Sequence, residues 1–173
     1  PMHEALTRLI RDVPDFPKPG IVFKDITPLL ADPGGLSLAV ELMANPWRDQ
    51  RPDLVIGAES RGFIFGTAAA QALSCGFVPV RKPGKLPGAT TSVRYELEYG
   101  TDELQIHTDA IRPGQKVLLV DDLIATGGTA KAACELVAKL GGEVLGLTVL
   151  IELEGLGGRA RLEPVGVESL IRY

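Results

Sequence analysis

The chain has few of the residues that cross-link small folds or bind transition metals. It contains two cysteines, two histidines and one tryptophan among 173 residues. Cys75 and Cys134 show no metal-ligand spacing and stand among apolar neighbours, so we predict buried free thiols. His3 and His107 are isolated, which gives a histidine metal site or a nucleophilic triad little support.

Long apolar runs are lacking as well. No run approaches the roughly 18 residues of a membrane span, so no membrane partner is expected. No signal-peptide pattern opens the chain, which predicts a cytoplasmic protein. The formal net charge of −4 argues against a nucleic-acid partner. The composition, with 45% hydrophobic and 23% charged residues, suits one globular domain with a sizeable core.

The strongest signal lies in residues 117–130. The apolar run 117–120 predicts a strand that is buried on both faces of a parallel sheet. Asp121 and Asp122 follow it, and then come a Thr-Gly-Gly-Thr loop at 126–129 and a helical apolar pattern. Open α/β sheets bind ligands at the carboxyl ends of their strands, so we expect a binding site at this point of the chain.

A glycine loop in front of a helix predicts an anion site. Glycine permits the tight turn, and the helix N-terminus adds unsatisfied N–H donors and a partial positive charge. No lysine stands where a P-loop needs one, so nucleoside triphosphate hydrolysis is not implied. The predicted phosphate-binding residues are Ala125, Thr126, Gly127, Gly128 and Thr129.

The acidic pair indicates what the rest of the ligand is. Asp121 and Asp122 would repel a phosphate, but carboxylates accept hydrogen bonds well from vicinal hydroxyls. We therefore predict a bound ribose 5-phosphate, with the two aspartates on its 2′ and 3′ hydroxyls. The alternative is an ordinary strand-to-helix turn in which Asp121 and Asp122 only cap the helix.

Two further segments carry charge that suits a pyrophosphate group. Residues 59–62, Glu-Ser-Arg-Gly, form the turn after a predicted strand and offer an arginine with backbone donors. The basic loop, residues 81–88, is rich in cations, and a charge run of this kind is usually a solvated face. Arg81 could instead reach a neighbouring subunit. The predicted pyrophosphate-binding residues are Glu59, Ser60, Arg61, Lys82 and Lys85.

The remaining pattern predicts an α/β fold with a mainly parallel central sheet flanked by helices. The proline-rich segment 15–28 is predicted to be a stiff loop that presents Phe16, Val22 and Phe23. A G-x-G-x-x-A pattern at 155–160 is rejected as a dinucleotide site because too few residues follow it. The predicted helices are 2–12, 35–45 and 63–73, the other strands are 54–58, 77–80, 144–153 and 167–171, and a hairpin joins 91–99 to 103–107.

Residues 117–130 resemble the signature of the type I phosphoribosyltransferases, enzymes that use 5-phosphoribosyl 1-pyrophosphate (PRPP). Other segments resemble the adenine branch of that family. Val-Phe-Lys-Asp at 22–25 is similar to its hood over the purine, and Leu-Glu-Tyr-Gly at 97–100 is similar to its mobile lid. The resemblance implies a type I phosphoribosyltransferase fold with an N-terminal arm and hood (1–33), a core (34–173) and a flexible hairpin lid (about 87–107).

The resemblance also assigns roles to further residues. Glu98 and Tyr99 match the lid pair, and Glu98 would handle the proton of the adenine imidazole ring. Glu98 thus joins Asp121 and Asp122 as a candidate catalytic residue. Some members carry arginine where this chain has Lys24, a change that backbone readout of the base should tolerate. The positions that correspond to adenine contacts are Val22, Phe23, Lys24 and Leu153.

The implied reaction joins adenine and PRPP to give AMP and pyrophosphate, a step of purine salvage. The resemblance further implies a homodimer and Mg²⁺, which would be held through pyrophosphate, ribose and water without direct protein ligands. Two alternatives stay open. One is a phosphoribosyltransferase for another base, such as xanthine or orotate, and the other is a non-catalytic regulator that binds the phosphoribosyl ligand on the same fold.

Overall fold

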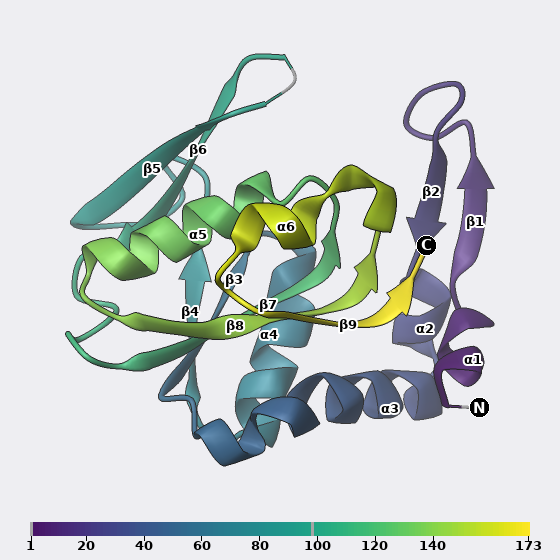
Figure 1. Ribbon diagram of the computed structural model, residues 1–173, viewed down its shortest axis with the longest axis horizontal. Helices are drawn as coiled ribbons and strands as arrows, with labels where there is room; N and C mark the ends of the chain where they lie inside the picture. Colours follow the sequence, from purple (N-terminus) through teal and green to yellow (C-terminus); the bar gives the residue numbers. More distant parts are fainter. Residues whose placement is uncertain (1, 98) are drawn as a thin grey trace.

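The structure, a computed structural model, describes residues 2–97 and 99–173 (Figure 1). At its centre lies a five-stranded sheet with strand order β4-β3-β7-β8-β9. Every pairing in this sheet is parallel, which confirms the predicted α/β architecture. The strands are β3 (Leu54–Ala58), β4 (Gly76–Val80), β7 (Lys116–Ile124), β8 (Glu143–Glu152) and β9 (Val167–Arg172).

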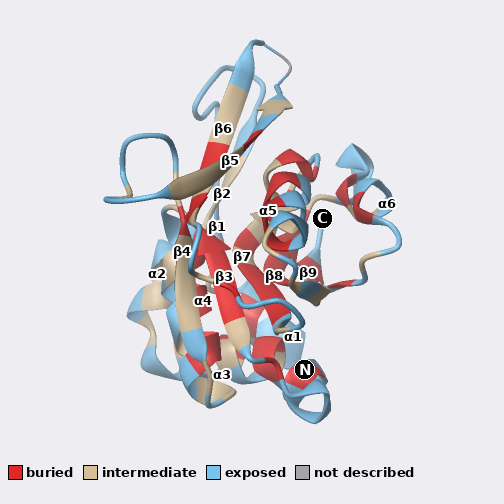
Figure 2. Cartoon of the chain, turned by 90° about the vertical axis from the view of Figure 1, so that its left-hand side faces the viewer, coloured by how far each residue is buried: buried red, intermediate tan, exposed pale blue. Residues whose placement is uncertain are grey.

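The central strands carry apolar side chains on both faces of the sheet, so helices cover both faces. Along β7, Val117 and Leu119 belong to one layer of the core, while Leu118 and Val120 belong to the other. Figure 2 shows the buried residues concentrated in the sheet and in the helices against it. The covering helices are α5 (Gly128–Lys139) on the first face and α3 (Pro33–Ala44) and α4 (Arg61–Ala72) on the second.

The predicted helices over 35–45 and 63–73 are confirmed as α3 and α4. Helix α3 begins where the sequence offers a cap, because the Asp32 side chain accepts a hydrogen bond from the Gly35 N–H at 2.7 Å. None of the described helices combines the length and the apolar character that crossing a membrane requires. The shorter helices are α1 (Met2–Thr7), α2 (Thr27–Ala31), η1 (Asn45–Gln50), η2 (Glu154–Leu156) and α6 (Gly158–Leu162).

The N-terminal segment differs from the prediction. The helix expected over 2–12 ends at Thr7, and part of the expected loop 15–28 is a strand. Strands β1 (Arg11–Pro14) and β2 (Val22–Asp25) pair antiparallel as a separate two-stranded ribbon. Proline is unfavourable inside a central strand, but Pro14 lies at the end of a strand in a ribbon that has no central strand.

The predicted hairpin is confirmed as β5 (Thr90–Glu96) and β6 (Thr101–His107), which pair antiparallel. The base of this hairpin is packed into the core. Val93 and Leu104 are buried in the same core layer as α5. Tyr99 at the tip is 83% exposed. The hairpin therefore stands on a packed base and extends away from the sheet (Figure 2).

Strand β7 is longer than predicted. The prediction ended it at Val120, but it continues to Ile124, which pairs with Glu152 of β8. Asp121 and Asp122 are therefore residues of the strand, and their side chains start toward opposite faces of the sheet. The backbone pairing of β7 with β8 continues beyond the apolar run 117–120, and this pairing keeps the later residues of β7 in the sheet.

Candidate active site

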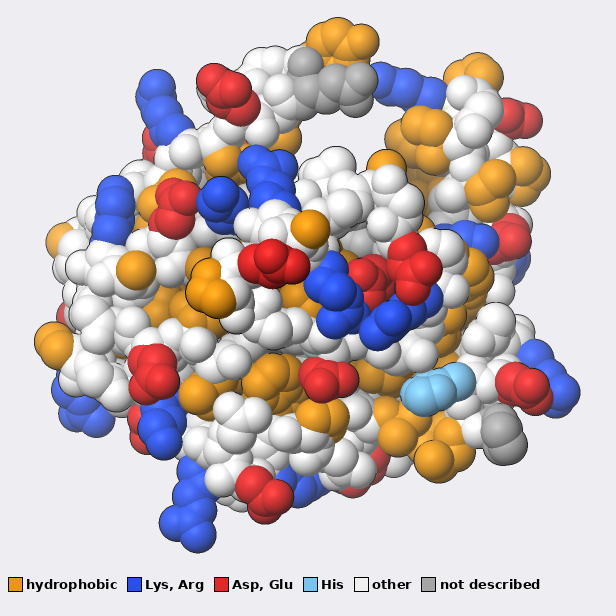
Figure 3. All heavy atoms as spheres, viewed as in Figure 1, with side chains coloured by type: hydrophobic (Ala, Val, Ile, Leu, Met, Phe, Trp, Pro, Cys, Tyr) orange, Lys and Arg blue, Asp and Glu red, His pale blue; other side chains and the backbone are white. Residues whose placement is uncertain are grey.

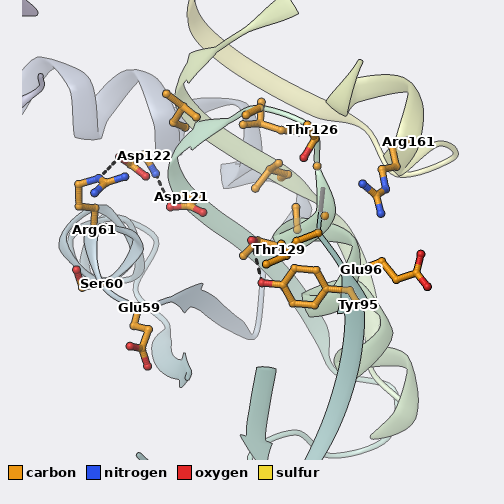
Figure 4. Close-up of a pocket in the computed structure, with 18 residues that line it drawn as sticks. Glu59, Ser60, Arg61, Tyr95, Glu96, Asp121, Asp122, Thr126, Thr129 and Arg161 are labelled. Atoms are coloured by element: carbon orange, nitrogen blue, oxygen red, sulfur yellow. Dashed lines mark hydrogen bonds and ion pairs between the residues drawn. The ribbon is translucent and has the colours of Figure 1, made fainter. Parts of the chain in front are cut away.

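A cleft of about 760 Å³ opens at the carboxyl ends of the parallel strands. Most of its lining comes from residues 59–61 before and in α4, 95–97 in the hairpin, 121–130 across β7 and α5, and Arg161 of α6 (Figure 4). The space-filling view shows the surface hollowed between the hairpin and the β1–β2 ribbon (Figure 3). This is the edge of the sheet at which open α/β folds bind ligands.

The predicted phosphate-binding residues form a cradle, residues 125–129, at the passage from β7 to α5. Gly127 has a φ of +87°, in the left-handed region that favours glycine. A Cβ at Gly127 would lie 3.0 Å from the Gly158 carbonyl oxygen, so the site is also crowded. Helix α5 begins at Gly128, and its first N–H groups need partners from outside the helix. The cradle thus has the geometry of an anion site.

The two aspartates line the cleft but have different surroundings. The Asp122 carboxylate accepts a hydrogen bond from Arg61 Nε at 2.6 Å (Figure 4). Its side chain is 10% exposed, whereas that of Arg61 is 53% exposed. The Asp121 carboxylate accepts the Asp122 backbone N–H at 2.8 Å. Burial, and next the negative charge of Asp122, raise the pKa of Asp121 well above its usual value.

The predicted pyrophosphate turn also lines the cleft with Glu59, Ser60 and Arg61. Glu59 faces the basic loop, where its carboxylate accepts the Lys82 backbone N–H at 2.9 Å and Arg81 Nε at 3.2 Å. The backbone hydrogen bond from Lys82 is the main reason that the pKa of Glu59 is lowered. The turn and the basic loop are therefore joined through one carboxylate.

The side chains of Lys82 and Lys85 are not part of the cleft lining. Lys82 Nζ lies 3.4 Å from the Asp102 carboxylate on strand β6, and Lys85 is exposed on the loop. A charge-rich segment in the sequence does not reveal which way its side chains turn. Whether Arg81 reaches another subunit stays a prediction, and within the chain its guanidinium is engaged by Glu59.

The predicted adenine residues Val22, Phe23, Lys24 and Leu153 lie beyond the cleft lining. Arg61 lines the cleft and also approaches one of these residues, because its guanidinium carbon lies 6.0 Å from the centre of the Phe23 ring. The Lys24 side chain is engaged elsewhere, by the Asp12 carboxylate at 2.7 Å. The Leu153 N–H donates to the Ile124 carbonyl at 3.0 Å, which places Leu153 beside the end of β7.

The predicted lid pair is placed only in part. Glu98 lies outside the residues that the structure describes, and Tyr99 is exposed at the tip of the hairpin. Tyr95, a hairpin residue for which the sequence predicted no role, contacts the cradle. The Tyr95 hydroxyl lies 3.3 Å from the Thr129 hydroxyl, so the hairpin touches the cradle (Figure 4).

Arg161 is a further cleft residue that sequence reasoning missed. It follows directly on the G-x-G-x-x-A pattern at 155–160, and nothing in that pattern connects it with the cradle.

Cys75 and Cys134 are free thiols as predicted, although both are only partly buried. Burial raises the pKa of each thiol, so neither resembles an activated nucleophile.

Comparison with known proteins agrees with this geometry. A family model described as the phosphoribosyl transferase domain matches residues 27–166. An adenine phosphoribosyltransferase of Rhodopirellula baltica is 58% identical over 171 residues, which cover 99% of this chain and 83% of that relative. The chain belongs to the adenine phosphoribosyltransferase family. Family membership confirms the predicted enzyme class, a transferase of pentosyl groups that acts in purine salvage.

Solved structures of the family have the same fold. The crystal structure of adenine phosphoribosyltransferase from Rhodothermus marinus superposes with a TM-score of 0.95 at 54% identity, covering 99% of this chain and 98% of that one. The Saccharomyces cerevisiae enzyme, complexed with an imino-altritol bisphosphate and adenine, superposes with a TM-score of 0.93 at 40% identity. That alignment covers 98% of each chain. The predicted type I phosphoribosyltransferase fold is therefore confirmed.

Proposed function

We propose that the cleft transfers the 5-phosphoribosyl group from PRPP to adenine and releases AMP and pyrophosphate. The observation that carries this proposal is that the cradle and the aspartate pair share one cleft. Together they complement the phosphate and the hydroxyls of a ribose 5-phosphate. Relatives named adenine phosphoribosyltransferases, and the yeast complex with adenine, support adenine as the acceptor.

The proposed reaction breaks the bond between ribose C1 and a pyrophosphate oxygen and joins C1 to a ring nitrogen of adenine. Positive charge builds up on the ribose, and Asp121 and Asp122 stabilise it. In the free chain the Asp122 carboxylate is engaged by Arg61 at 2.6 Å. Binding of PRPP would exchange these partners, because pyrophosphate attracts Arg61 and a ribose hydroxyl can donate to Asp122.

Residues 59–61 are proposed to hold the pyrophosphate, and Lys82 and Lys85 are proposed to approach it from the basic loop. Glu59 carries a negative charge, so its role in this proposal is to anchor the basic loop through the Lys82 N–H. The Lys82 side chain would have to leave Asp102, from which it is 3.4 Å away. Both lysines are exposed, which leaves them free to turn.

Mg²⁺ is proposed as the cofactor. Among residues 2–97 and 99–173, no group of three or more His, Cys, Asp and Glu side chains is arranged to hold a metal ion. This suits an ion that would be held through pyrophosphate, ribose and water without direct protein ligands, while Asp121 and Asp122 hold the ribose hydroxyls. When bound, the ion would neutralise charge on the departing pyrophosphate.

The base is proposed to lie between the hood and the end of β8. Val22, Phe23, Lys24 and Leu153 would surround it, with the arm and hood (residues 1–33) attached to the core (34–173). Glu98 would accept or position the proton of the adenine imidazole ring, and Tyr99 would arrive with it when the lid closes. Closure would exclude water from the reactive ribosyl centre.

We also propose that the chain acts as a homodimer in the cytoplasm. The family resemblance is the support for both statements. If Arg81 contributes to a neighbouring subunit, it has to leave Glu59, whose carboxylate lies 3.2 Å from its Nε.

A panel of bases tests the proposed function. With PRPP and Mg²⁺, adenine should support release of pyrophosphate, while hypoxanthine, guanine, xanthine and orotate should be slower by on the order of 100-fold or more. A site whose polar groups fit one base leaves them unpaired with another. Faster release with xanthine or orotate would assign the chain to another base. Binding of PRPP without turnover on any base would indicate a non-catalytic regulator.

Replacing Glu98 with alanine should lower kcat by roughly tenfold or more, since general acid–base groups contribute at least that much. The melting temperature should stay nearly unchanged, because Val93 and Leu104 make the core contacts of the hairpin. Affinity for PRPP should also persist, because the cradle is untouched. Asp109→Ala is the matched control, an exposed acidic residue just after β6 that should change none of the three. A lower melting temperature with normal kcat would make Glu98 structural.

A further inference from the structure

Helix α6 forms a wall of the phosphate cradle by close backbone contact. A Cβ at Gly158 would lie 2.5 Å from the Ala125 carbonyl oxygen and 2.8 Å from the Ile124 side chain. From the other side, a Cβ at Gly127 would lie 3.1 Å from Gly158 Cα. The two segments can approach this closely only because glycine stands on both sides of the contact. Whatever α6 carries toward the cleft is therefore held next to the cradle.

The side chain that α6 brings to the cleft is Arg161. A Cβ at Gly128, the first residue of α5, would lie 3.6 Å from Arg161 Nη1. Figure 4 shows the guanidinium turned into the cleft, in the space between Thr126 and Glu96. Within the part of the chain that the structure describes, Arg161 forms no ion pair with an acidic side chain.

A neighbouring arginine fixes the orientation of α6. Arg159 donates to the Glu152 carboxylate through Nη2 at 2.7 Å and Nε at 3.1 Å, and Ser169 donates to the same carboxylate at 2.7 Å. Glu152 is 5% exposed, and the hydrogen bond from Arg159 is the main cause of its lowered pKa.

Because of the helical repeat, the side chains of Arg159 and Arg161 leave α6 in different directions. Residues two apart on a helix leave it roughly 200° apart, as follows from about 3.6 residues per turn. Arg159 is anchored to β8 and β9 through Glu152 and Ser169, so Arg161 faces away from them. The hydrogen bonds of Arg159 to Glu152 and Ser169 therefore orient Arg161 toward the cradle.

The cradle itself supplies only neutral donors. Backbone N–H groups and the hydroxyls of Thr126 and Thr129 can bind a phosphate, but a 5′-phosphate carries a charge of about −2 near neutral pH. We propose that Arg161 is the cation of this subsite and binds the 5′-phosphate of the phosphoribosyl ligand. This inference rests on the proposed function. A guanidinium suits the task because its planar donors match two phosphate oxygens.

The test compares ligands with and without the phosphate. In Arg161→Gln the dissociation constants of AMP and ribose 5-phosphate should rise on the order of tenfold or more, as expected for a lost charge-assisted hydrogen bond. The dissociation constant of adenosine should not change. Arg161→Lys should recover part of the loss, because it restores the charge without the fork.

Arg112→Gln is the matched control, since it removes the same charge from an exposed arginine in the loop before β7 and should leave all three constants unchanged. An unchanged AMP constant in Arg161→Gln would overturn the inference, as would equal weakening of AMP and adenosine. If the unmodified protein bound neither AMP nor ribose 5-phosphate, the proposed function would fail first. The two failures are thus distinguishable.

Discussion

Replacing Asp121 and Asp122 together with asparagine is expected to lower kcat by on the order of 100-fold or more, as when other preorganised electrostatic groups are removed. The double substitution keeps the shape of both side chains and removes the two carboxylates that line the cleft. Their charge matters most when the ribose becomes positive. The measurement is steady-state turnover of adenine and PRPP, together with the dissociation constant of PRPP.

The ion pair between Arg61 and Asp122 adds a second expectation. Asp122→Asn frees Arg61, so the affinity for PRPP should fall less than kcat does. The matched control is the double variant Asp49→Asn with Asp109→Asn, two exposed acidic residues outside the cleft. It also replaces two aspartates with asparagine and should leave turnover unchanged. The structure already excludes capping of α5 by this pair, because both residues lie in β7 and α5 has no side-chain cap. Turnover close to normal in the Asp121/Asp122 variant would show that the pair does not stabilise the charge on the ribose.

Replacing Gly127 with valine is expected to weaken AMP binding by on the order of 100-fold or more, because it disturbs both the conformation of the cradle and its contact with α6. The residue has a φ of +87°, which a β-branched side chain rarely adopts. Its Cβ would also meet the Gly158 backbone at 3.0 Å, and backbone cannot move aside as a flexible side chain can. The sheet should remain folded, as circular dichroism would show.

Gly114→Val separates the two causes. Gly114 has a φ of +86°, nearly that of Gly127, but a Cβ there would find no atom within 4 Å. The control therefore carries the conformational strain without the collision and lies away from the cleft. It should cost some stability and leave AMP binding intact. Normal AMP binding by the Gly127 variant would show that residues 125–129 are not the phosphate site.

The sequence predicted those parts of the site that are consecutive in the chain. The β7–α5 segment could be read directly, because the apolar run, the two aspartates and the glycines stand in one stretch of residues. The sheet and its main helices followed from the same kind of local pattern. The family resemblance then added an interpretation for the hood and the lid, which composition alone would have left as a surface arm and a surface hairpin.

The parts that the sequence could not give depend on contacts between distant residues. No local pattern shows that Arg61 pairs with Asp122, or that Arg161 reaches the cradle through α6. The sequence shows the positive charge of Lys82 and Lys85. The direction in which these side chains point depends on partners such as Asp102. The β1–β2 ribbon was missed because prolines near a strand weigh against it unless the pairing partner is known.

The separation of the cleft residues along the chain has a consequence for folding. Arg61 and Asp122 touch although they are 61 positions apart in the sequence. Parallel pairing of β3 with β7 has to bridge a similar distance, and contacts of this kind form late because the entropy of closing a long loop is lost before they are made. The loop before α5 can adopt its turn early, while the cleft exists only once β3 has docked. We therefore expect a refolding chain to gain its phosphate-binding turn before it gains a place for the rest of the ligand.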